Sequence, residues 1–161
     1  MADSDYSLTV YIAVRGCPMV RDDESAADPS SVGHMWISLD DNTTGLKESY
    51  GFHPTKEGMP IWSGEVRTDD LHAYTQIYYQ KSFPITKDTH DNLHDYCQIA
   101  RKCHTFGFYS GIGNACVDFA WDVMHAAGIP IPALMYVFPV VKDWPTWNAS
   151  LVDIAYANYM E

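Results

Sequence analysis

Cys116 stands at the start of an expected helix, directly after the glycine-rich stretch at 111–113. Behind it, apolar residues recur at three- and four-residue intervals, as in an amphipathic helix; they are Val117, Ala120, Trp121, Met124 and Ala127. In the first turn of a helix the positive end of the dipole stabilises a thiolate, so the thiol pKa should fall. The spacing therefore favours Cys116 as a nucleophile.

The two ends of this predicted helix carry matching signals. Asn114 is suited to cap its N-terminus, and Gly128 followed by Pro130 should stop it. A lone cysteine is more often a small buried hydrophobic residue than a catalyst. The catalytic interpretation therefore depends on partner side chains.

Cysteine catalysis needs an imidazole that takes the thiol proton, a polar group that orients the imidazole, and donors for the oxyanion. Among the seven histidines, His34 is favoured as the base, because it follows Gly33 and opens a strand that should pack on the core. His53, just after the next strand, is its main rival. Four others lie in polar or helix-surface contexts: His72, His90, His94 and His104. His125 lies too far along the Cys116 helix to reach the thiol.

The orienting group is expected on the strand that pairs with the His34 strand. Four residues there are within range: Glu48, Ser49, Tyr50 and His53. Because side chains alternate between the two faces of a strand, only one parity shares the His34 face, and the pairing register decides which. Ser49 is the predicted third residue.

A different group of potential ligands lies on a predicted helix, where His90, His94 and Cys97 are spaced i, i+4 and i+7. The same face carries Leu93 and Ala100, and no fourth ligand is indicated. A stripe that flanks the core is the simpler interpretation. We expect neither a metal nor another cofactor.

Length and composition narrow the class of protein. A chain of 161 residues with 47% hydrophobic content predicts a single domain over 1–161. A formal net charge of −11, with only ten Lys and Arg, argues against binding to nucleic acid or anionic membranes. Residues 1–16 lack the features of a secretory signal, and no apolar run is long enough to span a membrane. We expect a chain made in the cytoplasm, without a disulfide framework from its four cysteines.

The coarse order of elements comes from alternation, turn residues and caps. The predicted elements are a strand at 7–14, a loop at 15–31, a hairpin with strands at 33–39 and 46–52, an irregular stretch at 53–64, one or two strands within 71–83, a helix at 87–104 capped by Thr86, the Cys116 helix, and an extended proline-containing tail from 129 with a short helix near 147–159. This order indicates the α+β class, with an antiparallel sheet packed against a few helices.

Three short motifs in this order resemble a known family. They are Gly-His-Met-Trp-Ile-Ser-Leu at 33–39, Ser-Tyr-Gly-Phe-His-Pro at 49–54 and Asn-Ala-Cys-Val-Asp-Phe at 114–119. The chain resembles the circularly permuted branch of the NlpC/P60 papain-like cysteine hydrolases, and is most similar to small effector toxins of the type VI secretion system. One departure is Ala115, which separates Asn114 from Cys116 where members of that branch often have Asn-Cys, so a capping or oxyanion role for Asn114 is in question.

The resemblance implies a permuted papain-like fold with Cys116 as nucleophile, His34 as base and a third residue on the following strand. It also implies a cysteine amidase or endopeptidase that cleaves an amide bond in bacterial peptidoglycan stem peptides. An antibacterial effector of this kind would be carried by a secretion apparatus into the target-cell periplasm. Its further partners would be an immunity protein and the carrier.

Two other classes remain open. A related permuted papain-like enzyme could act as an isopeptidase on protein conjugates, or as a lipid acyl hydrolase or acyltransferase, although the acidic charge and missing hydrophobic anchor weigh against lipids. A non-enzymatic binding domain could use the eleven tyrosines and five tryptophans as a recognition surface. Reactivity of the Cys116 thiol distinguishes an enzyme from a binding domain.

Overall fold

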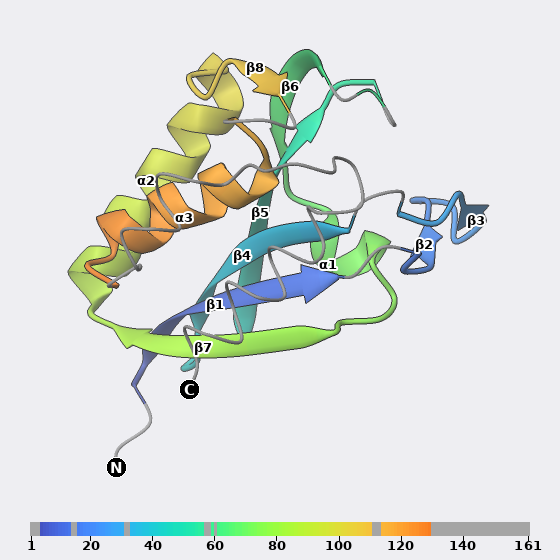
Figure 1. The fold of residues 1–161 in the computed structure, drawn as a ribbon. Coiled ribbons are helices and arrows are strands. Elements are labelled where there is room, and N and C mark those ends of the chain that lie inside the picture. Colours follow the sequence, from blue (N-terminus) through green and yellow to red (C-terminus); the bar gives the residue numbers. More distant parts are fainter. Residues whose placement is uncertain are drawn as a thin grey trace.

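A computed structural model describes residues 4–13, 16–30, 33–56, 59, 61–110 and 114–129. Its main feature is a six-stranded sheet in the order β7-β1-β4-β5-β6-β8, in which every recorded pairing is antiparallel (Figure 1). The strands are β1 (Tyr6–Ala13), β4 (His34–Asp41), β5 (Leu46–Pro54), β6 (Ile61–Arg67), β7 (Tyr79–Ile85) and β8 (Phe108–Ser110). A separate two-stranded ribbon is formed by β2 (Met19–Val20) and β3 (Ala26–Ala27).

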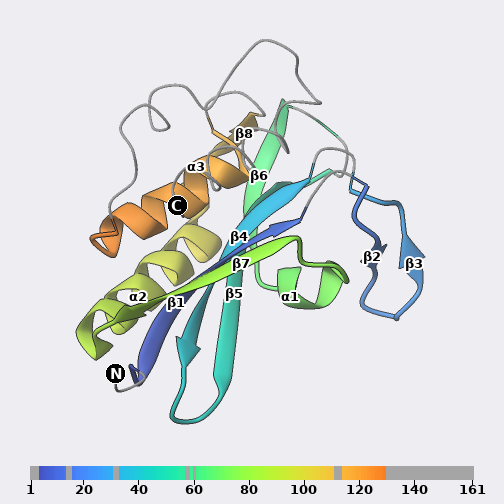
Figure 2. The ribbon, with the colours of Figure 1, turned by 60° about the horizontal axis from the view of Figure 1, so that its bottom comes forward.

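The described helices lie on both sides of this sheet. The longer two, α2 (Lys87–Cys103) and α3 (Cys116–Ala126), lie together against one face, whereas the short α1 (Asp70–Ala73) lies near the β2–β3 ribbon on the other (Figures 1 and 2). The architecture is α+β, as predicted. Within the described residues, no helix combines the length and apolar character needed to cross a membrane.

Alternating residues of the central strands build the core beneath α2 and α3. Leu8, Val10 and Ile12 of β1 point to this side. Their neighbours there include Met35, Ile37, Leu39, Tyr50, Phe52, Leu93, Cys97, Phe119 and Val123. Complete burial of each large apolar side chain stabilises the fold by about 1.5–3 kcal/mol. This packing fixes α3, and with it Cys116, against β4 and β5.

The opposite sheet face is polar at one end, around the buried carboxylate of Asp40. Thr9 donates to Asp40 Oδ2 over 2.6 Å, and Ser38 donates to Oδ1 over 2.5 Å. The Lys47 ammonium lies 3.0 Å from Oδ2. A buried charge is tolerated only when it is paired and hydrogen-bonded, and these three donors satisfy Asp40.

The long elements match the sequence predictions closely. The predicted strands at 7–14, 33–39 and 46–52 correspond to β1, β4 and β5 within two residues at each end, and α2 begins where Thr86 caps it by accepting the Thr89 N–H over 3.1 Å. The predicted loop at 15–31 instead contains the short β2–β3 ribbon.

The region between β5 and α2 differs from its prediction. The stretch expected to be irregular contains most of β6, and the residues expected to open a strand form α1. Gly64 resembles a strand breaker in the sequence, but a Cβ there would lie 2.2 Å from the Phe52 ring. The glycine thus lets β6 approach a packed aromatic side chain.

The Cys116 helix is present, with one correction at its start. Its N-cap is Ala115 rather than Asn114, because Asp118 accepts the Ala115 N–H over 2.7 Å and satisfies the helix end. The Asn114 amide instead donates to the carbonyls of Phe106 and Phe108 over 2.8 and 2.7 Å. Gly128 follows with a φ of +74°, as expected for a stop.

The predicted glycine-rich loop at 111–113, the proline-containing tail beyond 129 and the short helix near 147–159 lie outside the described residues.

Candidate functional site

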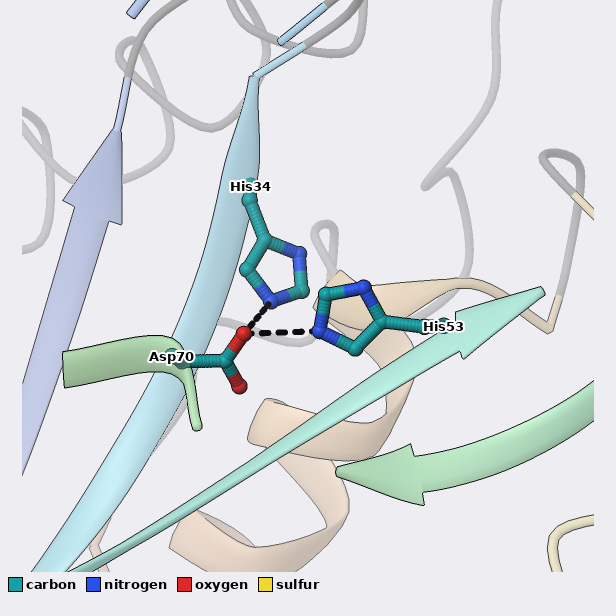
Figure 3. Close-up of side chains that lie close together, drawn as sticks. All are labelled: His34, His53 and Asp70. Atoms are coloured by element: carbon teal, nitrogen blue, oxygen red, sulfur yellow. Dashed lines mark hydrogen bonds and ion pairs between the residues drawn. The ribbon is translucent and has the colours of Figure 1, made fainter. Parts of the chain in front are cut away.

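His34, His53 and Asp70 meet on the sheet face that carries α1. Figure 3 shows both imidazole rings directed at one carboxylate oxygen. The distance to Asp70 Oδ1 is 3.1 Å from His34 Nε2 and 2.7 Å from His53 Nε2. The centroids of the two imidazole rings are 4.2 Å apart. Three residues that are far apart in the sequence thus form one compact cluster.

The pairing register explains why the two histidines share a face. Ile37 lies opposite Tyr50 and Ser38 opposite Ser49, so even positions of β4 share a face with odd positions of β5. His34 and His53 are therefore on one side of the sheet.

Asp70 comes to the histidines from the turn after β6. In this turn Arg67 pairs with Asp69 over 2.7 Å. Asp70 is the first residue of α1 and is completely buried. Asp69 thus has Arg67 as its own cationic partner, and Asp70 is the acidic residue that faces the histidines.

Gly51 makes room for the Asp70 carboxylate. A Cβ at position 51 would lie 2.0 Å from Asp70 Oδ2 and 2.8 Å from His34 Nε2. Because contacts this short do not occur, any larger residue would displace the carboxylate or the ring. Gly51 is therefore part of the site through its missing side chain.

Aromatic rings enclose His34. Its imidazole stacks on Tyr74 and Trp36, with centroid distances of 5.0 and 5.5 Å. The His34 side chain is 4% exposed, whereas that of His53 is 13% exposed. His53 is thus the more accessible of the two imidazoles.

The electrostatics keep Asp70 ionised and His34 neutral. Burial alone would raise the pKa of Asp70, but His53 and His34 outweigh it and hold that pKa below its usual value of 3.8. Burial, together with repulsion from His53, lowers the pKa of His34 below 6.5 although Asp70 opposes this. At neutral pH the His34 imidazole is therefore a neutral base beside a carboxylate.

Cys116 is the first residue of α3 and belongs to the buried core cluster that also contains Met35, Val117 and Tyr109. The residue is only 4% exposed.

The expected low pKa of Cys116 is wrong for this resting structure. Burial raises the pKa of the thiol to about 11, and the nearby backbone of Met35 and Val117 offsets only part of this effect. Removing a charge from water outweighs the helix dipole here. The resting side chain at neutral pH is a thiol.

Cys116 and His34 lie on opposite faces of β4, and among the described residues the structure brings their side chains into no recorded contact. Cys116 packs in the core with Met35, whereas His34 points toward Trp36 and Tyr74 on the other face. The recorded pairing of β4 with β5 ends at Ile37, and from Gly51 onward β5 pairs with β6. The sheet therefore divides beside His34 and Met35.

The other candidates for the third residue occupy distinct places. Ser49 shares the His34 face, and its hydroxyl donates to the Thr68 carbonyl over 3.0 Å. Tyr50 lies on the opposite face and accepts from Gln98, while Glu48 lies 3.5 Å from His94. Ser49 thus contacts the segment that leads to Asp70.

Sequence reasoning missed Asp70 and Tyr109. An acidic residue in the first turn of a helix is ordinary, and nothing in the local pattern marks Asp70 as buried. Tyr109 lies on the short β8, which the sequence analysis did not predict. Only tertiary packing brings it into the core cluster that contains Cys116.

The helical group of potential ligands is dispersed. The ring of His90 is tilted against that of Tyr6 with a centroid distance of 4.9 Å, His94 faces Glu48, and Cys97 is buried in the core. Across the described ranges, the one close group of three potential metal ligands is His34, His53 and Asp70.

Comparison with models of protein families, with curated proteins and with solved structures found no match for this chain, so the candidate site rests on its own geometry.

Proposed function

We propose that this chain is a cysteine hydrolase in which Cys116 attacks an amide carbonyl and His34 transfers the proton. The observation that supports this most is the position of the thiol at the start of α3, packed in the core cluster that contains Met35, the residue after His34. The Asp70 carboxylate lies 3.1 Å from Nε2 of the His34 imidazole. The resemblance to permuted NlpC/P60 hydrolases adds a consistent order of motifs.

His34 has one ring nitrogen for each role. Its Nε2 faces the Asp70 carboxylate (Figure 3), so we assign the thiol proton to the other ring nitrogen, Nδ1. The Asp70 charge stabilises the imidazolium that forms. His53 is the second imidazole on the same carboxylate oxygen and positions Asp70.

The reaction then follows two steps. As a carbon–sulfur bond forms at the carbonyl, the thiol proton moves to His34, which next delivers it to the leaving amine as the carbon–nitrogen bond breaks. Water attacks the resulting thioester with His34 as base, releasing a carboxylic acid and restoring the thiol. Because Cys116 rests as a thiol, this mechanism transfers the proton during attack and needs no preformed thiolate.

For the substrate we propose an amide bond in the stem peptides of bacterial peptidoglycan. The support is the family resemblance of the motifs at 33–39, 49–54 and 114–119. We further propose that the protein is an antibacterial effector, delivered by a secretion apparatus to the periplasm of a target cell and countered by an immunity protein.

The test is digestion of purified peptidoglycan with analysis of the soluble products by mass spectrometry. Amide hydrolysis adds one water to the mass and creates a new amine. We expect Cys116→Ala and His34→Ala to abolish product formation while their circular dichroism spectra stay native. The matched controls are Cys103→Ala, at an exposed cysteine, and His94→Ala, at a half-exposed histidine.

Undiminished digestion by Cys116→Ala would refute cysteine catalysis. Hydrolysis of a protein conjugate or a lipid ester without any action on peptidoglycan would instead support the isopeptidase or acyl-hydrolase alternative. A wild type that forms no product from any of these substrates would support a binding domain.

A further inference from the structure

The cluster of His34, His53 and Asp70 has the chemistry of a metal site. Two imidazole nitrogens and one carboxylate oxygen, supplied by β4, β5 and α1, lie within 4.8 Å of one another. Two histidines and a carboxylate are a ligand set that Zn²⁺ uses when its fourth position stays open. The ligand types therefore suit a borderline divalent ion better than Ca²⁺ or Mg²⁺, which prefer oxygen.

Two atoms of this cluster lack hydrogen-bond partners. His34 Nε2 and Asp70 Oδ2 are both buried without a partner among the described residues. His34 Nε2 lies 3.1 Å from Asp70 Oδ1 but is not aligned for a hydrogen bond with it. Buried polar atoms in this condition are rare, and an unseen ion is one of their recognised explanations. An ion between the three side chains would bind the Nε2 lone pair and the carboxylate charge together.

The spacing of the ligand atoms supports the same conclusion. Zinc bonds of about 2.0–2.2 Å in tetrahedral geometry place two ligand atoms roughly 3.4 Å apart. The two nitrogens are 3.1 and 2.7 Å from Asp70 Oδ1, and all three ligand atoms lie within 4.8 Å of one another, so small side-chain movements would bring them to this spacing. Stacking on Tyr74 and Trp36 already fixes the His34 ring.

We propose that His34, His53 and Asp70 bind one Zn²⁺ ion. A metal on Nε2 of His34 leaves the ring proton on Nδ1, so the ring no longer accepts a proton from Cys116. A protein with zinc bound could therefore not use His34 for thiol catalysis, a consequence that rests on the proposed function. The zinc site itself does not depend on that function.

The experiment uses full-length protein that has been dialysed against a chelator and then titrated with Zn²⁺ in competition with a chromogenic chelator. We expect one equivalent to bind and to raise the melting temperature. His53→Ala and Asp70→Asn should weaken binding more than about a hundredfold, since changes behind metal ligands already cost 10–100-fold. Co²⁺ should give the visible bands of a low-coordinate site in the wild type and lose them in His53→Ala.

Two controls separate this site from the rest of the chain. His94→Ala removes a histidine of the helical group and should bind zinc as the wild type does. Cys116→Ala should also keep the zinc affinity while losing any hydrolysis, so failure of the zinc site and failure of the proposed catalysis give different results. Absence of zinc binding by the folded wild type, or unchanged affinity in both His53→Ala and Asp70→Asn, would overturn the proposal.

Discussion

The reactivity of Cys116 gives the sharpest test of the electrostatics described above. Its pKa is raised from 9.0 to about 11, so the thiolate fraction at pH 7 is about a hundredfold below that of an ordinary thiol. A more basic thiolate is also a better nucleophile, and a Brønsted coefficient of about 0.4–0.5 returns roughly 6–10-fold. We therefore expect the raised pKa alone to make Cys116 react about 10–20-fold more slowly than an ordinary thiol. Restricted access of the reagent to the buried sulfur would slow the reaction further.

The assay follows reaction with a small aromatic disulfide between pH 6 and 9.5, with each mixed disulfide located by mass spectrometry. Free N-acetylcysteine provides the rate of an ordinary thiol, and exposed Cys103 shows that the reagent attacks the folded chain. The rate at Cys116 should rise about tenfold for each pH unit and show no plateau below pH 9.5, because its thiolate is still the minor form there. In urea this difference from the reference thiol should disappear.

A plateau below pH 8, or a rate above that of N-acetylcysteine at pH 7, would refute this reasoning. Either result would mean that the helix dipole and a protonated imidazole outweigh the loss of hydration, as the sequence alone predicted. The same measurement on His34→Ala would then show whether the imidazole is responsible.

The remaining predictions concern the groups that support the site. Gly51→Ala should destabilise the fold by about 1–3 kcal/mol in thermal melts and shift the NMR resonances of the His34 and His53 imidazoles. Gly64→Ala crowds the Phe52 ring instead, so it should destabilise the fold by a similar amount and leave those resonances in place. Ser49→Ala should keep most hydrolytic activity and lower the free energy of unfolding by about 1 kcal/mol, whereas Asp70→Ala should abolish activity. If both variants fold and lose activity equally, the result would instead support Ser49 as the third catalytic residue. Because the pKa of Asp70 is lowered in the folded protein, this carboxylate contributes its full stabilisation above pH 3.8, the usual pKa of aspartate, and loses it as the pH falls further. Asp70→Asn should therefore make the free energy of unfolding, measured with urea, decline less steeply in acid. Asp40→Ala should destabilise the fold by about 2–3 kcal/mol in the same assay, because it removes the buried acceptor that Thr9, Ser38 and Lys47 share. An unchanged unfolding midpoint would contradict the role given to this carboxylate.

Elements with a strong local pattern could be predicted from the sequence. Alternation over Tyr6–Ala13 defines β1, and the Thr86 cap with its apolar face defines α2. The strand β6 and the helix α1 could not be predicted, because their stability comes from neighbours. Gly64 weakens a strand locally and is favoured only when the Phe52 ring lies against it.

The candidate site could be predicted in part. His34, His53 and Cys116 stand out by residue type and order, but the histidine parity depends on a pairing register that a single sequence does not contain. Asp70 is one of two adjacent acidic residues, and only the tertiary structure shows that Arg67 pairs with Asp69 while Asp70 is buried. The direction of the Cys116 pKa shift likewise depends on burial, which the local pattern does not reveal.

The order of strands also constrains how the chain folds. The strand β1 lies between β4 and β7, and its Tyr6 pairs with Ile85 far along the chain. Pairings over such sequence separations favour folding in about milliseconds to seconds, unlike the microseconds of small helical bundles. During synthesis at about 5–20 residues per second, β1 emerges several seconds before β7. Because Cys116 follows both strands in the chain, it is synthesised after β1 and β7.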